Sequence, residues 1–187
     1  MKNWIKVASA AAIGIALRAS AANAAWEKVV VATEGAYPPF NMVDENGKLI
    51  GFDVDFANKL CETAKIECEI VAQDWDGMIP GLLAKKYDAI IAQMSITEER
   101  KRSIDFTNYY SNTPAVFVGK DTMKIEAYKD GEVMEDALDG MVIGVQRSTT
   151  HANFLEDNFP NIEIRMYGTQ DEALLDLTAG RVDAVSY

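Results

Sequence analysis

The sequence predicts an α/β protein with two lobes of similar architecture, each built on a mostly parallel sheet with helices on both faces. Segments of strand and helix character alternate along residues 28–94, and the alternation begins again at residue 141. A repeated sequence supports the same interpretation, because Leu82–Ile90 and Leu177–Val185 share Leu, Ala, Asp and Ala at matching positions. Each copy lies at the step from the second helix to the third strand of its lobe.

The first 24 residues have the features of a secretory signal peptide. Lys2 and Lys6 form a basic start, residues 7–17 form an apolar run, and Ala22-Asn23-Ala24 supplies a small-x-small cleavage site. We therefore expect export to the periplasm, with cleavage after Ala24. Removing residues 1–24 leaves 15 basic against 29 acidic side chains, a net charge of −14. This charge argues against nucleic acid and anionic membranes as partners.

The first lobe is expected over residues 25–115. Its opening run, Lys28–Thr33, is rich in β-branched residues and predicts a buried strand, which Gly35–Pro39 ends as a loop. Asp44–Gly47 is typical of a tight turn. Apolar spacing predicts the remaining elements, namely a helix at 53–63, a strand at 67–72, a helix at 78–84 and a strand at 88–94.

Both cysteines of the chain, Cys61 and Cys68, lie in this lobe, at the end of a predicted helix and the start of a predicted strand. An even number of cysteines in an exported protein favours a disulfide. A bridge here would pin the helix-to-strand turn and contribute about 2–3 kcal/mol by the loop-entropy model.

The second lobe, expected over residues 120–187, follows an extended segment, Pro114–Gly119, that we expect to act as the hinge. Residues 120–139 are charged and weakly periodic, which predicts a linker or an insertion. The rest of the lobe repeats the alternation of the first, with a strand at 141–145, a helix at 150–158, a strand at 162–166, a helix at 172–179 and a strand at 182–187.

Two such lobes form a cleft, and ligands of parallel sheets bind at the carboxyl ends of the strands. Glu34 and Tyr37 follow the first strand, Trp75 follows the second, and Gln93 and Ser95 follow the third. A carboxylate at this edge favours a cationic partner, and two loop aromatics are typical of a sandwich around an aliphatic or cationic side chain. The alternative for each aromatic ring is packing over the core.

Three other places at the cleft allow a functional and a purely structural interpretation. Arg100 could point back and clamp a carboxylate, or Ser95–Glu98 could form a capping box at a helix start. Thr149 and Thr150 open a helix, where hydroxyl and free N–H groups form an anion site or serve only as an N-cap. Asp53 begins the first helix, and its negative charge could simply interact favourably with the helix dipole.

Signals of catalysis are weak. His151 is the only histidine of the chain, and a lone histidine is more often structural than catalytic. The sequence has no nucleophile elbow, zinc-protease motif, phosphate-binding loop or cysteine–histidine metal spacing. We therefore expect a binding protein that is not an enzyme and that uses no metal or cofactor.

Several segments resemble the motifs of one protein family. They cover almost the whole sequence after the predicted signal peptide and are Ala32–Phe40, Gly51–Asp55, Trp75–Leu82, Asp88–Arg100, Gly144–Thr150 and Leu177–Ala184. The chain is thereby identified as similar to the family 3 solute-binding proteins of ABC importers for polar amino acids and opines. The resemblance implies a type II periplasmic-binding-protein fold, with two lobes joined by hinge strands. The spacing of Cys61 and Cys68 also resembles that of the family's basic amino-acid binders, where the pair is a disulfide.

The resemblance implies roles for the residues of the cleft. Arg100 would hold the α-carboxylate of the ligand, with help from Ser95 and from the helix start at Thr149-Thr150. Ser148 stands where a glycine is common in the family, so the backbone of that loop is expected to differ.

The other cleft residues would decide selectivity. Tyr37 and Trp75 would flank the ligand side chain, and Glu34 would meet a distal cation, which favours a basic amino acid or an opine. Ala92 and Gln93 stand where many members have small hydroxyl residues, so the exact ligand stays open. A membrane permease would be the protein partner, and we expect a monomer.

Members of the family extend well beyond the length of this chain. We therefore expect the second lobe and the hinge to be incomplete here, so that residues 1–187 alone would bind ligand poorly. Two other functions stay open, because dehydratases of prephenate-like acids and the sensory domains of receptors also resemble this family.

Overall fold

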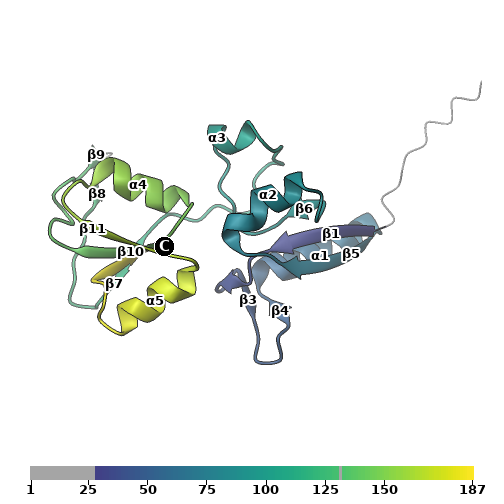
Figure 1. Ribbon diagram of the computed structural model, residues 1–187, viewed down its shortest axis with the longest axis horizontal. Coiled ribbons are helices and arrows are strands. Elements are labelled where there is room, and N and C mark those ends of the chain that lie inside the picture. Colours follow the sequence, from purple (N-terminus) through teal and green to yellow (C-terminus); the bar gives the residue numbers. More distant parts are fainter. Residues whose placement is uncertain (1–27, 131) are drawn as a thin grey trace, which may run out of the picture.

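The computed structural model describes residues 28–130 and 132–187. The predicted signal peptide, residues 1–24, lies outside the described residues. Among the described residues, no helix combines the length and the apolar character needed to cross a membrane. The chain forms two α/β lobes side by side, with the N-terminal half in one and the C-terminal half in the other (Figure 1). The predicted two-lobed α/β architecture is therefore confirmed.

The first lobe contains a three-stranded parallel sheet in the order β5-β1-β6. Its strands and main helices are β1 (Lys28–Thr33), β5 (Glu67–Ala72), β6 (Ala89–Ile90), α1 (Phe52–Ala64) and α2 (Met78–Leu83). Neighbouring side chains of β1 point to opposite faces, so Val31 packs with Ala57 of α1 while Ala32 packs with Met78 of α2. The sheet is therefore covered by helices on both faces, as the apolar run in β1 predicts.

A small antiparallel sheet and a disulfide complete this lobe. The sheet consists of β2 (Ala36–Tyr37), β3 (Asn41–Val43) and β4 (Leu49–Ile50), so part of the expected loop 35–39 is a short strand. Asp44 closes the predicted turn, because its carboxylate accepts hydrogen bonds from the backbone N–H groups of Asn46 and Lys48. The disulfide joins Cys61 in α1 to Cys68 in β5 with an S–S distance of 2.00 Å, which confirms the predicted bridge.

The third strand of the first lobe is shorter than predicted. Only Ala89–Ile90 is assigned to β6, instead of residues 88–94. The chain turns away at Gln93, whose φ of 51° lies in the left-handed region and does not fit an extended strand. Residues 91–97 therefore form a loop, which leads to the short helix α3 (Glu98–Lys101).

The second lobe repeats the plan of the first. Its sheet has the order β11-β10-β12-β7, with the first three strands parallel and β7 antiparallel to β12. Its elements are β7 (Phe117–Gly119), β10 (Val142–Gln146), α4 (Thr150–Asn158), β11 (Glu163–Tyr167), α5 (Gln170–Thr178) and β12 (Ala184–Ser186). Leu155 of α4 packs with Ile143, and Ala173 of α5 packs with Val185, in separate core clusters.

The sequence repeat has a direct structural counterpart. In the first lobe the carboxylate of Asp88 accepts a hydrogen bond of 2.8 Å from the backbone N–H of Val30. In the second lobe Asp183 accepts the equivalent bond, also 2.8 Å, from Val142. The matching aspartates therefore tie the third strand to the first strand in the same way in both lobes.

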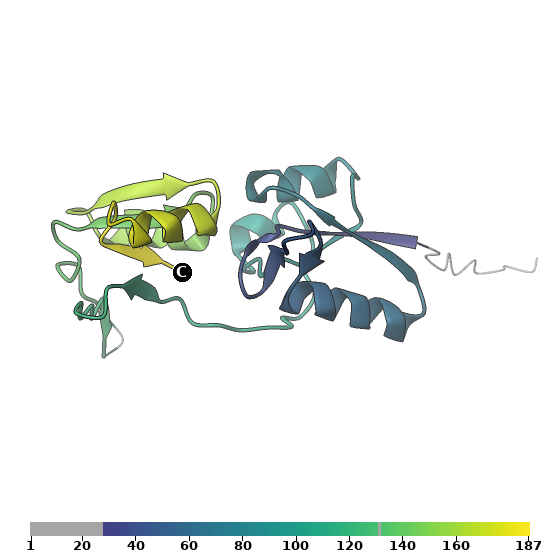
Figure 2. The ribbon, with the colours of Figure 1, turned by 90° about the horizontal axis from the view of Figure 1, so that it is seen from below.

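The segment between the lobes differs from the sequence-based expectation in two ways. An extended stretch leaves the first lobe as predicted, but its end, Phe117–Gly119, is strand β7 at the edge of the second sheet (Figure 2). Residues 120–139 are not a simple linker, because Ala127 and Leu138 belong to the core of the second lobe. They also contain the short hairpin strands β8 (Tyr128–Lys129) and β9 (Glu132–Val133). These apolar contacts follow no helical or strand period, so the sequence pattern did not reveal them.

Candidate functional site

A small cavity of about 40 Å³ lies between the two lobes and is lined by residues of both. All eight residues that the sequence singles out for binding contribute to its wall: Glu34, Tyr37, Trp75, Gln93, Ser95, Arg100, Thr149 and Thr150. The structure adds four lining residues to this set: Ala92, Gln146, His151 and Gln170.

The position of the cavity follows from the topology of the two sheets. Glu34 directly follows β1, and the segment 92–95 follows β6. Trp75 begins the short 3₁₀ helix η1 (Trp75–Gly77), just after β5. On the other side, Gln146 ends β10 and Gln170 begins α5. The carboxyl ends of the parallel strands in both lobes therefore face one space, as expected for sheets of this kind.

Glu34 is a buried carboxyl group that spans the gap between the lobes. The residue is 8% exposed, and its Oε1 accepts a hydrogen bond of 2.6 Å from Nε2 of Gln146. Burial raises the pKa of Glu34 to about 7, because desolvation outweighs the opposing hydrogen bond from Gln146. A cation placed beside this carboxyl would favour its ionised form.

Arg100 turns back from α3 into the cavity. Its Nη1 donates to the carbonyl of Ser95 at 2.9 Å, and its Nη2 donates to the carbonyl of Ser148 at 3.3 Å. The guanidinium also lies over the ring of Trp75, 5.5 Å from the ring centroid. Desolvation by burial lowers the pKa of Arg100, but from a value so high that the side chain stays charged.

The alternative of a capping box at Ser95 is wrong. The N-cap of α3 is Thr97, whose Oγ1 accepts from the backbone N–H of Arg100 at 3.1 Å. The Ser95 hydroxyl is instead 3.5 Å from Oγ1 of Thr150, across the gap between the lobes. Ser95 is therefore available to the cavity.

At the start of α4 the two threonines have different surroundings. Thr149 is the N-cap, because its Oγ1 accepts from the backbone N–H of Ala152 at 3.1 Å. The same hydroxyl donates to the carbonyl of Gln146, so it has little capacity left for a ligand. Thr150 faces Ser95 and keeps a hydroxyl at the cavity. His151 follows it, and burial lowers the pKa of this imidazole, which favours the neutral form.

The aromatic and amide side chains of the first lobe shape the remaining wall. Tyr37 stacks on Tyr187 of the second lobe, with ring centroids 4.8 Å apart. Gln93 lines the cavity, but its amide donates to Asp53 at 2.7 Å and accepts from Ser111 at 2.8 Å. Its side chain therefore supports the wall more than it reaches into the space.

Sequence reasoning missed two kinds of residue. Asp53 is 1% exposed and accepts hydrogen bonds from Asn41, Gln93 and Tyr110, so its role goes beyond the helix dipole. Nothing in the local sequence signals this buried network. Gln170, which begins α5, also lines the cavity and was missed, whereas Gln146 lies at a strand end where the sequence places the cleft.

Residues 29–180 match the profile of the bacterial extracellular solute-binding proteins, family 3. Over 181 residues the chain is 46% identical to the octopine-binding periplasmic protein of Rhizobium meliloti, an alignment that covers 87% of this chain. Over 182 residues it is 42% identical to the L-arginine-binding protein of Pseudomonas aeruginosa, with 96% of this chain covered. The chain spans 62% of the octopine-binding protein and 68% of the arginine-binding protein.

A solved structure shows the same fold. It is that of an ancestral arginine-binding protein bound to glutamine, with a TM-score of 0.76 and 35% sequence identity. The match covers 86% of this chain and 69% of that one.

Proposed function

The chain belongs to the bacterial extracellular solute-binding proteins of family 3, and we propose that it captures a cationic amino acid or an arginine-derived opine between its lobes. One observation carries the proposal. The cavity holds the carboxyl of Glu34 and the guanidinium of Arg100, and none of the ion pairs among the described residues includes either group. A ligand with one carboxylate and one distal cation complements both.

The contacts of the cavity suggest how such a ligand is oriented. Arg100 donates to the carbonyl oxygens of Ser95 and Ser148, and an α-carboxylate is a stronger acceptor for the same guanidinium. Tyr37 and Trp75 line the same space and offer aromatic surface to the aliphatic part of the ligand. The distal cation then meets Glu34, whose burial makes an opposite charge favourable.

The named relatives support this ligand class. They bind octopine and L-arginine, and the ancestral arginine-binding protein holds glutamine. Glutamine is therefore the informative comparison, because it has the α-carboxylate and the α-ammonium of arginine but no distal charge. The proposal predicts that Glu34 makes arginine bind more tightly than glutamine.

In the proposed role the protein binds its ligand and catalyses no reaction. In this role the protein is a periplasmic monomer, exported by residues 1–24, that closes around one ligand and delivers it to the membrane permease of an ABC importer. The relatives support this role, since they are binding proteins rather than enzymes.

Thermal unfolding of the purified full-length protein with a ligand panel tests the proposal. Arginine, lysine, histidine and octopine are compared with glutamine and glutamate. A ligand at about 100 times its Kd stabilises the folded state by about 2.7 kcal/mol, which gives a readily measured rise in Tm. We expect the cationic ligands and octopine to raise Tm more than glutamine and glutamate do. A rise with glutamate equal to that with arginine would refute the proposed selectivity.

A matched pair of variants assigns the effect to the cavity. Glu34→Gln removes the buried carboxylate, whereas Glu62→Gln removes an exposed one that pairs with Lys59 on α1. We expect Glu34→Gln to weaken arginine binding more than glutamine binding, and Glu62→Gln to leave both unchanged.

A further inference from the structure

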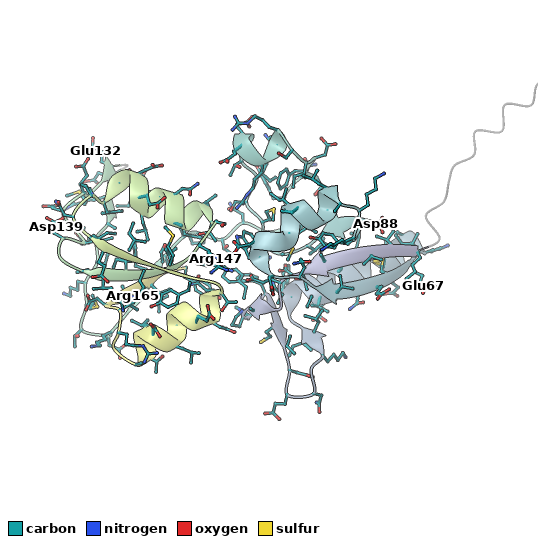
Figure 3. The ribbon with its side chains drawn as sticks, viewed as in Figure 1. Glu67, Asp88, Glu132, Asp139, Arg147 and Arg165 are labelled. Atoms are coloured by element: carbon teal, nitrogen blue, oxygen red, sulfur yellow. A yellow bond between two sulfur atoms is a disulfide. The ribbon has the colours of Figure 1, made fainter. Side chains whose placement is uncertain are left out.

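An ion pair joins the two lobes outside the cavity. Asp76 lies in η1 of the first lobe and Arg147 directly follows β10 of the second, with Nε of Arg147 2.5 Å from Oδ2 of Asp76. Neither residue lines the cavity. Arg147 lies between the two lobes (Figure 3).

Each member of the pair is held in place by its own surroundings. The backbone N–H of Arg147 donates to the carbonyl of Tyr167 at 3.0 Å. Its guanidinium packs over Gly168, where an added Cβ would come within 3.3 Å of Nη1. Burial acts to raise the pKa of Asp76, but hydrogen bonds from Arg147 and Ser148 and the charge of Arg147 outweigh it and lower the pKa. Asp76 therefore meets Arg147 across the gap as a carboxylate.

We propose that Asp76 and Arg147 form a latch that favours the closed arrangement of the lobes without touching the ligand. The proposal rests on the proposed function, because a latch matters only if closure accompanies ligand capture. A contact that is made on closure and is absent from the cavity contributes the same free energy whatever the ligand is. The latch therefore raises the affinity for every ligand by the same factor, and the cavity residues alone determine selectivity.

The expected size of the effect is modest. The side chains of Arg147 and Asp76 are 50% and 41% exposed, so solvent and salt screen their attraction. Exposed ion pairs of this kind correspond to a change in affinity of about 1.5- to 5-fold. The effect should decrease as the salt concentration rises.

The affinity test uses Asp76→Asn, Arg147→Gln and the double variant, with Glu62→Gln as a control that breaks an ion pair within α1. Titration calorimetry gives Kd for arginine and for lysine. We expect each single variant to weaken both ligands by the same factor, about 1.5- to 5-fold. The double variant should be no weaker than either single one, because the two changes remove one interaction.

A second readout needs no ligand. Trp75 is half-buried, and its Nε1 donates to the carbonyl of Ser148 in the second lobe at 2.9 Å, so its emission reports lobe contact. Cleavage after Ala24 removes Trp4, and replacing Trp26 by Phe leaves Trp75 as the single tryptophan of residues 25–187. We expect Arg147→Gln, which acts from the opposite lobe, to shift the emission of Trp75 to the red at about 20 mM salt, and the difference from the parent to shrink at about 500 mM salt.

The outcomes separate the latch from the proposed ligand. A full-length parent protein that binds neither arginine nor lysine contradicts the proposed function, while the emission of Trp75 still decides the latch. Emission unchanged in Arg147→Gln, or shifted equally in Glu62→Gln, overturns the latch. If the variants weaken arginine and lysine binding by different factors, the latch is also overturned, because the ion pair would then contribute to ligand selectivity.

Discussion

Replacing Glu34 by glutamine is expected to remove most of the pH dependence of arginine binding. The perturbation keeps the size of the side chain and the partner Gln146 but removes the titrating group. In the parent protein, the carboxyl must be ionised to attract a distal cation. Arginine should therefore bind more tightly as the pH rises, and its binding below neutral pH should release a proton to the buffer.

The magnitude follows from the pKa of the buried group. Burial is the main cause that raises the pKa of Glu34 from 4.5 to about 7, with smaller contributions in the same direction from Asp171, Asp74 and Asp76. A cation beside the carboxylate that restores a pKa of 4.5 supplies about 3 kcal/mol when the whole shift is recovered. The corresponding gain in affinity is about 25-fold between about pH 5.5 and about pH 8.

Calorimetry across this pH range, in two buffers of different ionisation enthalpy, measures both Kd and proton release. Glutamine is the control ligand, because it lacks the distal cation. The glutamine control also accounts for His151, which lines the cavity and has a pKa lowered by burial. A parent whose arginine affinity is flat with pH, or a Glu34→Gln variant with the slope of the parent, would refute the assignment of the cation to Glu34.

Other changes test separate parts of the structure. Arg100→Ala should cost about 2–5 kcal/mol of binding free energy, since it leaves the ligand carboxylate without its charged partner, and calorimetry showing near-parent affinity would remove Arg100 from the site. Replacing Cys61 and Cys68 by serine should lower the free energy of unfolding by about 2–3 kcal/mol in urea melts, because the unfolded chain regains the entropy of the open loop, whereas an unchanged midpoint would contradict this. Ser148→Gly should raise stability by about 1 kcal/mol, because Ser148 has a φ of 59° that costs a residue with a Cβ more than glycine. A lower Tm for Ser148→Gly would instead mean that the loss of the Ser148 side chain beside Asp76 matters more than the backbone strain.

Sequence patterns located the cavity because they located the ends of strands. Once β1 and β10 are placed, the topology of parallel sheets brings Glu34 and Thr149 to facing edges, with no knowledge of side-chain contacts. Local chemistry also decided some details, such as the hydroxyl N-cap of α4 at Thr149.

The details that escaped prediction depend on contacts between distant residues. The short β6 ends because Gln93 adopts a left-handed conformation, held by a hydrogen bond from its backbone N–H to the hydroxyl of Tyr110. The burial of Asp53 depends on donors 12, 40 and 57 positions away along the chain. Leu138 enters the second core from a segment without periodicity. A pattern of neighbours in sequence carries no information about such contacts.

The paired bonds from Asp88 to Val30 and from Asp183 to Val142 have a consequence for strand register. In a sheet, a slip of one residue turns every following side chain to the opposite face. In the first lobe such a slip would also displace the loop that begins after β6, and Gln93 would lose its position opposite Asp53. Each aspartate fixes the alignment of the third strand with the first strand before the chain reaches the cavity. Residues beyond the strand ends can therefore be substituted without shifting the backbone that positions them.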